Sequence, residues 1–303
     1  MVYYLLVMVA RLIPGEARRR RFIEWARLRF STRAIVEAAL AEHRMSLEKT
    51  IYRGQMAEPP MTMTVDETLD ALIDGQSIAR FGDGELMTMK GRFDEFQTPG
   101  AELSRRLREV LASDEPGLLV GIPIFTYELS PEIADGMQHY CLSTAPWLRS
   151  TLKPFLIPDK VYAATEVSLA HSVFRPAFDR RAYFDKFRRV WEGADVVLVH
   201  GEGIFDRLSH DIFDNAASID HIIAPRQDAF EQYDDILHRV LQAPKGSLIL
   251  LVLGPTATVL AFDLHRAGYR ALDLGHIAKS YDWWLNDRTT YDEAANIEFF
   301  APD

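Results

Sequence analysis

An α/β fold built on a mainly parallel sheet is the fold class that the sequence predicts, and two observations support it. Past Pro59–Pro60, short apolar runs rich in Val, Ile and Leu alternate with stretches of helical periodicity, which is typical of βαβ units. Glycine-containing turns follow several of these runs, as at the edge where open α/β sheets bind ligands. We therefore expect one α/β domain at residues 61–303, preceded by a separate helical, basic segment at residues 1–60.

The first sixty residues differ in charge from the rest of the chain. They contain eleven Arg or Lys against six Glu, whereas the whole chain has a net charge of −10. The apolar run at 3–10 is too short to span a bilayer, and its positive charges follow it, whereas in a signal peptide they precede it. Residues 1–30 are expected either to contact an anionic membrane surface peripherally or to pack as an amphipathic helix on the main domain or on another subunit of a homo-oligomer. Failure to bind liposomes would exclude the membrane contact.

Seven apolar runs after residue 60 have the length and composition of buried strands, and helices between them show apolar stripes. The strands are expected at 77–81, 117–123, 161–165, 195–200, 219–224, 248–253 and 271–274. The stripes are Leu103, Leu107, Val110 and Leu111; Phe230, Tyr233, Leu237 and Leu241; and Val259, Leu260 and Leu264, in a helix that Gly268 ends.

Composition and missing motifs narrow the function. The acidic net charge argues against a general nucleic-acid binder, which would carry a basic face. The single cysteine, Cys141, cannot form an intrachain disulfide, which favours a reducing, cytoplasmic location and excludes a thiolate metal site. The dinucleotide fingerprint, the Walker A loop, His-Glu-x-x-His and Gly-x-Ser-x-Gly are absent, which counts against dehydrogenase, zinc hydrolase and serine esterase functions.

The run Arg80-Phe81-Gly82-Asp83-Gly84-Glu85 ends the first of the seven predicted strands. An extended Asp-x-Glu would project both carboxylates to the same side, and Gly84 would let another oxygen-rich group approach the backbone. Two hard oxygen ligands suit Mg²⁺ or Mn²⁺ with substrate phosphates completing the shell. The alternative is a solvated acidic turn. Arg80 either adds a fixed positive charge for a phosphate or forms a structural salt bridge that orients the acids.

A second turn, Gly254-Pro255-Thr256-Ala257-Thr258, joins an apolar strand to a helix. Its backbone amides and threonine hydroxyls would suit a phosphate or a nucleotide base. The alternative is that Thr256 or Thr258 only caps the helix.

Taken together, four segments resemble the bacterial glycosyltransferases of the GT-D fold, long catalogued as the domain of unknown function DUF1792. The segments are 77–85, Phe96-Gln97, 253–261 and 273–277, and the resemblance covers about residues 62–285. It implies a Rossmann-like sheet with helices on both faces and a nucleoside-diphosphate sugar donor, expected to be a UDP-sugar. It also implies that Asp83 and Glu85 hold Mn²⁺ or Mg²⁺ as an Asp-x-Glu motif. It places Arg80, Gln97, the turn of Gly254, Pro255, Thr256 and Ala257, and His276 in the donor cleft, and the glycine turns after the first and fourth predicted strands add Gly82 and Gly201 at the same edge.

Two departures from the family pattern bear on activity. After the fourth strand the family has Gly-x-Gly-Asn-Asp-Leu-Phe, whereas residues 207–213 of this chain read Arg-Leu-Ser-His-Asp-Ile-Phe. The family's aspartate is kept as Asp211, but its two glycines and its asparagine are not. After Gly-His-Ile the family places two acids, where this chain has Ala278 and Ser280. These changes would fit a different donor or acceptor, or a loss of activity.

The resulting hypothesis is a cytoplasmic, metal-dependent glycosyltransferase in bacterial surface polysaccharide or glycoprotein synthesis, held near the membrane by its basic segment. Sugar transfer with inversion needs a base for the acceptor hydroxyl, and Asp211 is the leading candidate, followed by His276 and His171. Two alternatives are a nucleotide-sugar binding protein without turnover and a metal-dependent phosphohydrolase that uses the same carboxylates.

Overall fold

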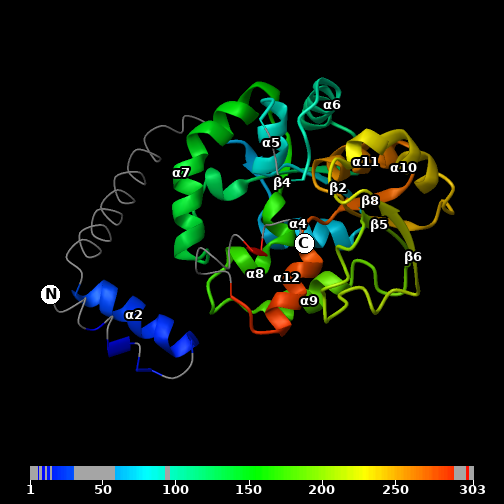
Figure 1. The fold of residues 1–303 in the computed structure, drawn as a ribbon. Helices are drawn as coiled ribbons and strands as arrows, with labels where there is room; N and C mark the ends of the chain where they lie inside the picture. Colours follow the sequence, from blue (N-terminus) through cyan, green and yellow to red (C-terminus); the bar gives the residue numbers. More distant parts are fainter. Residues whose placement is uncertain are drawn as a thin grey trace. The chain divides into compact units, whose positions relative to one another are not determined.

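The computed structural model describes residues 59–92, 96–289 and 298–299 and, near the N-terminus, residues 6, 9–10, 12–13 and 16–30. The chain divides into two compact units, Met1–Ala57 and Glu58–Asp303 (Figure 1). In the first unit, helix α2 (Glu16–Phe30) carries a run of exposed arginines and an exposed Trp25. None of the described helices is both long and apolar enough to cross a membrane. Peripheral membrane contact through residues 1–30 stays a prediction.

The described part of the second unit contains one sheet of eight strands, all parallel, in the order β1-β4-β3-β2-β8-β7-β5-β6. The predicted parallel α/β class is confirmed, and each of the seven predicted strands is present with its ends within two residues. The additional strand, β1, is two exposed residues long and has no apolar run to reveal it. The strands are β1 (Met61–Thr62), β2 (Ser77–Arg80), β3 (Leu118–Ile122), β4 (Val161–Ala164), β5 (Asp195–Gly201), β6 (Ser218–Ala224), β7 (Leu248–Val252) and β8 (Arg270–Asp273).

Helices cover both faces of this sheet, which is why its central strands are apolar throughout. One group comprises α5, α6, α10 and α11, and the other comprises α4, α8, α9 and α12, with contacts inside each group. Figure 1 shows α6 and α11 on one side of the strands and α9 and α12 on the other. Helix α7 packs against α5. The helices are α4 (Val65–Ile73), α5 (Asp83–Met89), α6 (Ala101–Leu111), α7 (Asp135–Leu152), α8 (Ala170–Val173), α9 (Arg180–Arg188), α10 (Tyr233–Val240), α11 (Pro255–Arg266) and α12 (Ile277–Leu285).

Four short 3₁₀ turns join elements of the described unit: η1 (Ile124–Thr126), η2 (Lys153–Phe155), η3 (Thr165–Ser168) and η4 (Ala229–Gln232). Two of the three predicted apolar stripes are confirmed, because all their residues in α6 and α11 are buried. Gly268 follows the end of α11 with φ +85°, a conformation that suits glycine at a helix C-terminus.

The stripe predicted for α10 is wrong in phase. Its buried residues are Tyr233, Ile236 and Val240, whereas Leu241 is 37% exposed. The predicted stripe began at Phe230, which lies in η4, and a 3₁₀ turn advances the chain by three residues per turn instead of 3.6. The helical period therefore starts at Tyr233.

The strand order reverses between β2 and β8. From β2 the chain moves to β3 and β4, away from β8, whereas β7 leads into β8 from the other side. The loop after β2 enters α5 in one helix group, and the loop after β8 enters α12 in the other. Ligands of open α/β sheets bind outside the carboxyl ends of the strands at such a reversal. This edge therefore is the candidate site.

The corrected stripe of α10 can be tested by stability. Ile236→Ala removes a fully buried side chain and is expected to lower the free energy of unfolding by about 2–5 kcal/mol. Leu241→Ala, at the exposed end of the predicted stripe, is expected to cost about 1 kcal/mol or less. Urea unfolding of both variants measures the difference, and equal losses would contradict the assignment of the buried face.

Candidate active site

Arg80 ends β2 and joins three strand ends. Its Nε donates to the carbonyl oxygen of Asp273 (2.7 Å), and its Nη2 lies 3.0 Å from Asp273 Oδ1. Its Nη1 donates to the carbonyl oxygen of Thr165 (3.0 Å) and to Ser168 Oγ (2.6 Å). The guanidinium is therefore a structural link between β2, β8 and η3, and its ionic partner is Asp273 instead of the predicted Asp83 or Glu85.

Asp273 completes this link from β8. Its Oδ2 accepts from the Arg80 backbone N–H (3.3 Å) and from Thr258 Oγ1 (3.3 Å). A Cβ at Gly275 would lie 2.0 Å from Arg80 Nη2, and Gly275 has φ +47°, so this position requires glycine. We call Arg80, Asp273, Thr165, Ser168 and Thr258 the Arg80 cluster.

Asp83 and Glu85 lie in the first turn of α5, so the predicted extended geometry is wrong. Successive helical residues are rotated by about 100°, so side chains two residues apart leave the helix in different directions and can share a cation only through their flexible ends. Glu85 Oε2 accepts from the Gly82 backbone N–H (2.7 Å), a capping contact that favours the helix at this point. Asp83 Oδ1 accepts from the Gly84 N–H (3.0 Å), and its Oδ2 accepts from the hydroxyl of Tyr140 on α7 (2.5 Å).

The donor set at the start of α5 fits a hard divalent cation. Carboxylate oxygens are preferred ligands of Mg²⁺ and Mn²⁺, and each oxygen has two lone pairs, so the contacts of Asp83 leave it able to coordinate. No group of three or more His, Cys, Asp or Glu able to hold a metal occurs among the described residues. A cation at Asp83 and Glu85 would therefore take most of its shell from water and substrate oxygens.

The turn after β7 uses its polar groups internally. Thr256 Oγ1 donates to Gln97 Oε1 (3.3 Å), and Thr258 Oγ1 donates to the carbonyl oxygen of Arg80 (2.9 Å). Neither threonine caps α11, because its N-cap is Gly254. Pro255 and Ala257 are buried in the first turn of the helix. The capping alternative is therefore wrong, and both hydroxyls make internal hydrogen bonds, while ligand contact by this turn stays a prediction.

Gln97 connects that turn to the segment before α10. Its side chain is buried, its Oε1 also accepts from the Phe230 N–H (3.1 Å), and its Nε2 donates to Asp228 Oδ1 (3.3 Å). Gly254, with φ +52°, lies under the neighbouring Phe96, whose Cβ would be 3.1 Å from an added Cβ.

Gly201, at the end of β5, requires glycine because another chain segment is close to it. A Cβ there would lie 2.9 Å from Arg226 Cα and 2.8 Å from Ile204 Cδ1. The close packing of the loops after β5 and β6 therefore accounts for this glycine.

His276 lies at the N-cap of α12, at the same edge as Asp83. Its ring contacts Phe96 and Phe299, with centroids 5.9 and 5.8 Å away. Burial, with the nearby charges of Lys279 and Arg80, lowers the pKa of His276 to about 3. An imidazole with that pKa is a poor base near neutral pH.

The structure does not bring Asp211 together with the Asp-x-Glu motif. Asp211 Oδ1 accepts from the Phe213 N–H (2.8 Å), and the carbonyl oxygen of the neighbouring Ile212 accepts from Trp191 Nε1 (3.1 Å). Trp191 lies just before β5, at the amino edge of the sheet, whereas Asp83 follows the carboxyl end of β2. His171, the third predicted base, is 2.6 Å from the carbonyl oxygen of Arg288 through Nε2, and burial lowers its pKa to about 4.

The two positions where the family has acids are buried in α12. Ala278 is buried, and Ser280 is fully buried and donates to the carbonyl oxygen of Ser168 (3.1 Å). Ser168 also accepts from Arg80. Ser280 therefore contributes to the packing around the Arg80 cluster.

Sequence reasoning missed Glu166, which follows β4 at the same edge. Its side chain is 6% exposed and accepts from the N–H groups of Ile124 and Phe125 at 3.4 Å. Burial raises the pKa of Glu166 to about 7, although the backbone hydrogen bonds to its carboxylate and, less strongly, the charge of Arg80 oppose the shift. An acid directly after a predicted strand was the available signal. Tyr140 gave no such signal, because its contact joins residues 57 positions apart.

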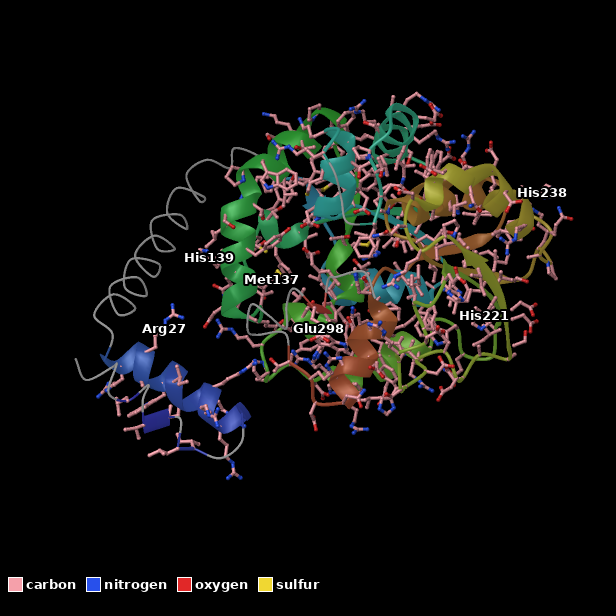
Figure 2. All side chains as sticks on the ribbon, in the orientation of Figure 1. Arg27, Met137, His139, His221, His238 and Glu298 are labelled. Carbon is pink, nitrogen blue, oxygen red and sulfur yellow. The ribbon has the colours of Figure 1, made fainter. Side chains whose placement is uncertain are left out.

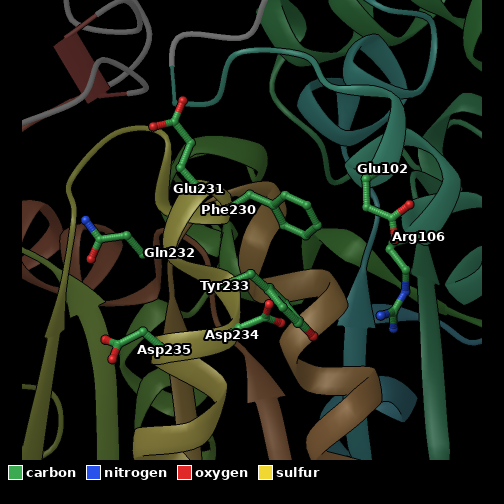
Figure 3. A pocket seen from close by; sticks show the side chains of 8 residues that line it. All are labelled: Glu102, Arg106, Phe230, Glu231, Gln232, Tyr233, Asp234 and Asp235. Carbon is green, nitrogen blue, oxygen red and sulfur yellow. The ribbon is translucent and has the colours of Figure 1, made fainter.

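A cavity of about 560 Å³ lies between α6 and the η4–α10 segment (Figure 3). On its wall, Arg106 pairs with Asp263 (2.6 Å), and the Tyr233 hydroxyl donates to the same carboxylate (2.5 Å). Four carboxylates against one guanidinium make the lining acidic, which disfavours a diphosphate. None of the predicted site residues lines it, so the candidate site is the sheet edge. The lining residues are Glu102, Arg106, Phe230, Glu231, Gln232, Tyr233, Asp234 and Asp235.

The Arg80 cluster is expected to be a major source of stability. Arg80→Ala leaves the Asp273 carboxylate buried without its counter-charge, which typically costs about 3–5 kcal/mol. Arg105→Ala is the control, since Arg105 is exposed on α6 and its pairs with Glu102 and Glu109 contribute little. Chemical denaturation measures both, and a loss for Arg80→Ala no larger than that of the control would contradict the structural role.

Glu166 is expected to make stability depend on pH. Because its pKa rises from 4.5 to about 7 on folding, the folded chain binds the proton more tightly than the unfolded chain. This contribution is fully present below pH 4.5 and is lost as the pH rises through 7. In Glu166→Gln the side chain stays neutral, so its Tm relative to the wild type is expected to rise across this window. A Tm difference that does not vary with pH would refute this assignment.

A family model for the glycosyltransferase GT-D fold matches residues 78–293. Two relatives are each 33% identical over 249 residues, or 78% of this chain: the probable glycosyl transferase Gly of Streptococcus gordonii and the glycosyltransferase GlyD of Streptococcus pneumoniae. The chain spans only 35% and 30% of the lengths of these two relatives.

Solved structures agree with the sequence relatives. A structure of the domain of unknown function 1792, described as a distinct glycosyltransferase fold, has a TM-score of 0.70 at 29% identity, over 77% of this chain and 89% of that one. A glycosyltransferase (DUF1792) from Streptococcus sanguinis has a TM-score of 0.70 at 32% identity, over 76% and 87%. The resemblance predicted from the four sequence segments is confirmed, and the chain belongs to the glycosyltransferase family with the GT-D fold.

Proposed function

We propose that this chain transfers a sugar from a nucleoside-diphosphate donor, with the diphosphate at the carboxyl edge between β2 and β8. The observation that carries the proposal is that Asp83 and Glu85 start α5 where the strand order reverses. Membership of a glycosyltransferase family supports the reaction class. Two carboxylates at this position are the donor set for the Mn²⁺ or Mg²⁺ that the proposal requires.

The chemistry of the site follows from the charge of the leaving group. Sugar transfer releases a nucleoside diphosphate, and a divalent cation supplies the neutralising charge when bound. Asp83 and Glu85 would hold the cation, while Arg80 acts on the site indirectly by fixing the ends of β2 and β8. The Arg80 guanidinium is committed to Asp273, Thr165 and Ser168, so in this proposal it does not contact the donor.

We further propose a UDP-sugar as donor and a glycan or glycoprotein acceptor in bacterial surface polysaccharide or glycoprotein synthesis. The relatives in Streptococcus, which are named as glycosyltransferases, support the reaction class, and the donor and acceptor are what the family resemblance implies. Because the chain spans about a third of their length, other segments of those proteins can add to their activity.

The proposal is tested by titrating UDP and UDP-sugars calorimetrically, with and without Mn²⁺. Asp83→Asn and Glu85→Gln remove the charges while keeping oxygen acceptors for the Tyr140 hydroxyl and the Gly82 N–H. Wild-type binding is expected to strengthen with Mn²⁺, and this gain is expected to be lost in both variants. Asp211→Asn is the matched control, since Asp211 accepts from the Phe213 N–H and not from a group of the candidate site, and its binding is expected to equal that of the wild type.

Other outcomes separate the competing functions. No nucleotide binding by the wild type under any metal condition would exclude the glycosyltransferase function for this chain. Donor binding with neither transfer nor hydrolysis would favour a binding protein. Acceptor-independent cleavage faster than transfer would favour a phosphohydrolase.

A further inference from the structure

The hydroxyl of Tyr140 contacts the first acid of the Asp-x-Glu motif. It donates to Asp83 Oδ2 at 2.5 Å from the second turn of α7, a helix that packs against α5. We infer that Tyr140 is a positioning residue that fixes the Asp83 carboxylate for the divalent cation. The inference rests on the proposed function, because it assigns a role toward the cation that Asp83 is proposed to hold.

The geometry leaves Asp83 able to coordinate while restricting its motion. Oδ1 accepts from the Gly84 N–H and Oδ2 accepts from the Tyr140 hydroxyl, so both oxygens are held at once. Each keeps a second lone pair for a cation. A carboxylate held in one rotamer loses less conformational entropy on binding, which is why hydrogen-bond partners of metal ligands typically contribute a factor of about 10–100 in affinity.

The helix that carries Tyr140 is fixed by the protein core. Its neighbours Cys141 and Leu142 are buried, as are Ala145 and Leu148 further along the helix. The helix start is tied down by the Ala134 N–H, which donates to the carbonyl oxygen of Val173 (2.8 Å). Figure 2 shows Met137 and His139, which precede Tyr140 on α7. The core therefore fixes the helix that holds the hydroxyl against Asp83.

The opposing interpretation is that Tyr140 only covers the surface. Its side chain is 38% exposed, and a surface tyrosine bound to an exposed carboxylate contributes little to stability. The two interpretations differ in what removal of the hydroxyl oxygen does to cation binding. A surface contact leaves it unchanged, whereas a positioning contact weakens it.

The test measures binding of Mn²⁺ alone, from the loss of the electron paramagnetic resonance signal of free Mn²⁺, in the full chain and in Tyr140→Phe. We expect the Kd for Mn²⁺ to rise by about 10–100-fold in the variant. Tyr127→Phe is the control, because the Tyr127 hydroxyl is buried, its ring lies against Arg149 in the last turn of α7, and the hydroxyl has no hydrogen-bond partner among the described residues. Its Kd is expected to stay at the wild-type value.

Two further measurements separate positioning from folding and from donor contact. Tm of the metal-free Tyr140→Phe variant is expected to stay near that of the wild type, and UDP affinity at saturating Mn²⁺ is expected to be unchanged. In an Asp83→Asn background, Tyr140→Phe is expected to have no further effect on the Mn²⁺ Kd.

A Tyr140→Phe variant that binds Mn²⁺ as the wild type does would overturn the inference and leave the proposed function intact. A wild type that binds Mn²⁺ neither alone nor in the presence of UDP would overturn both. A Tyr140→Phe loss matched by Tyr127→Phe would assign the effect to packing of the region and would also overturn the inference.

Discussion

The ion pair between Arg80 and Asp273 is the interaction on which the candidate site depends. It is largely buried, and it joins β2 to β8 at the point where the strand order reverses. Burying two charges is costly unless their remaining hydrogen-bonding groups are also satisfied, and Thr165, Ser168 and Thr258 supply those partners. If these strand ends separated, the charge of Arg80 or Asp273 would be left unpaired in the low-dielectric interior. This constraint fixes the starting points of both loops at the site.

The same cluster explains why several unusual strings occur together in the sequence. Arg80 and Asp273 belong to two of the four segments that carry the family resemblance, and Thr258 belongs to a third. Their side chains meet one another instead of facing a ligand. Gly275 makes room for the same cluster, because any side chain there would collide with the Arg80 guanidinium. Many of the residues that carry the family resemblance therefore support the site from within the protein. Asp83 and Glu85 are the residues that we propose to bind the cation.

The sequence predicted the sheet well because strands covered on both faces must be apolar along their whole length, as β3 and β7 are. It predicted less well wherever the outcome depended on a local competition or on a distant partner. The 3₁₀ turn η4 shifted the phase of α10, and the capping contact of Glu85 to Gly82 made the Asp-x-Glu motif helical. The partners of Arg80 and Asp83 lie up to 193 residues away, and no spacing rule reports such contacts. That is why Asp273 and Tyr140 were missed although their neighbours were found.

Because the Asp-x-Glu motif is helical, Asp83 and Glu85 make different contacts and are expected to have different roles toward the cation. Glu85 already stabilises the start of α5 through the Gly82 N–H, so moving its carboxylate toward a cation would compete with that capping contact. Asp83 precedes it by half a turn and faces α7, where the Tyr140 hydroxyl holds it without using all its lone pairs. Asp83 is therefore the acid that can act as the fixed ligand. Glu85 can contribute only through whatever coordination capacity its capping contact leaves. Because two such ligands fill only part of a Mg²⁺ or Mn²⁺ shell, the donor diphosphate has to supply oxygens to it, which couples metal binding to donor binding at this edge.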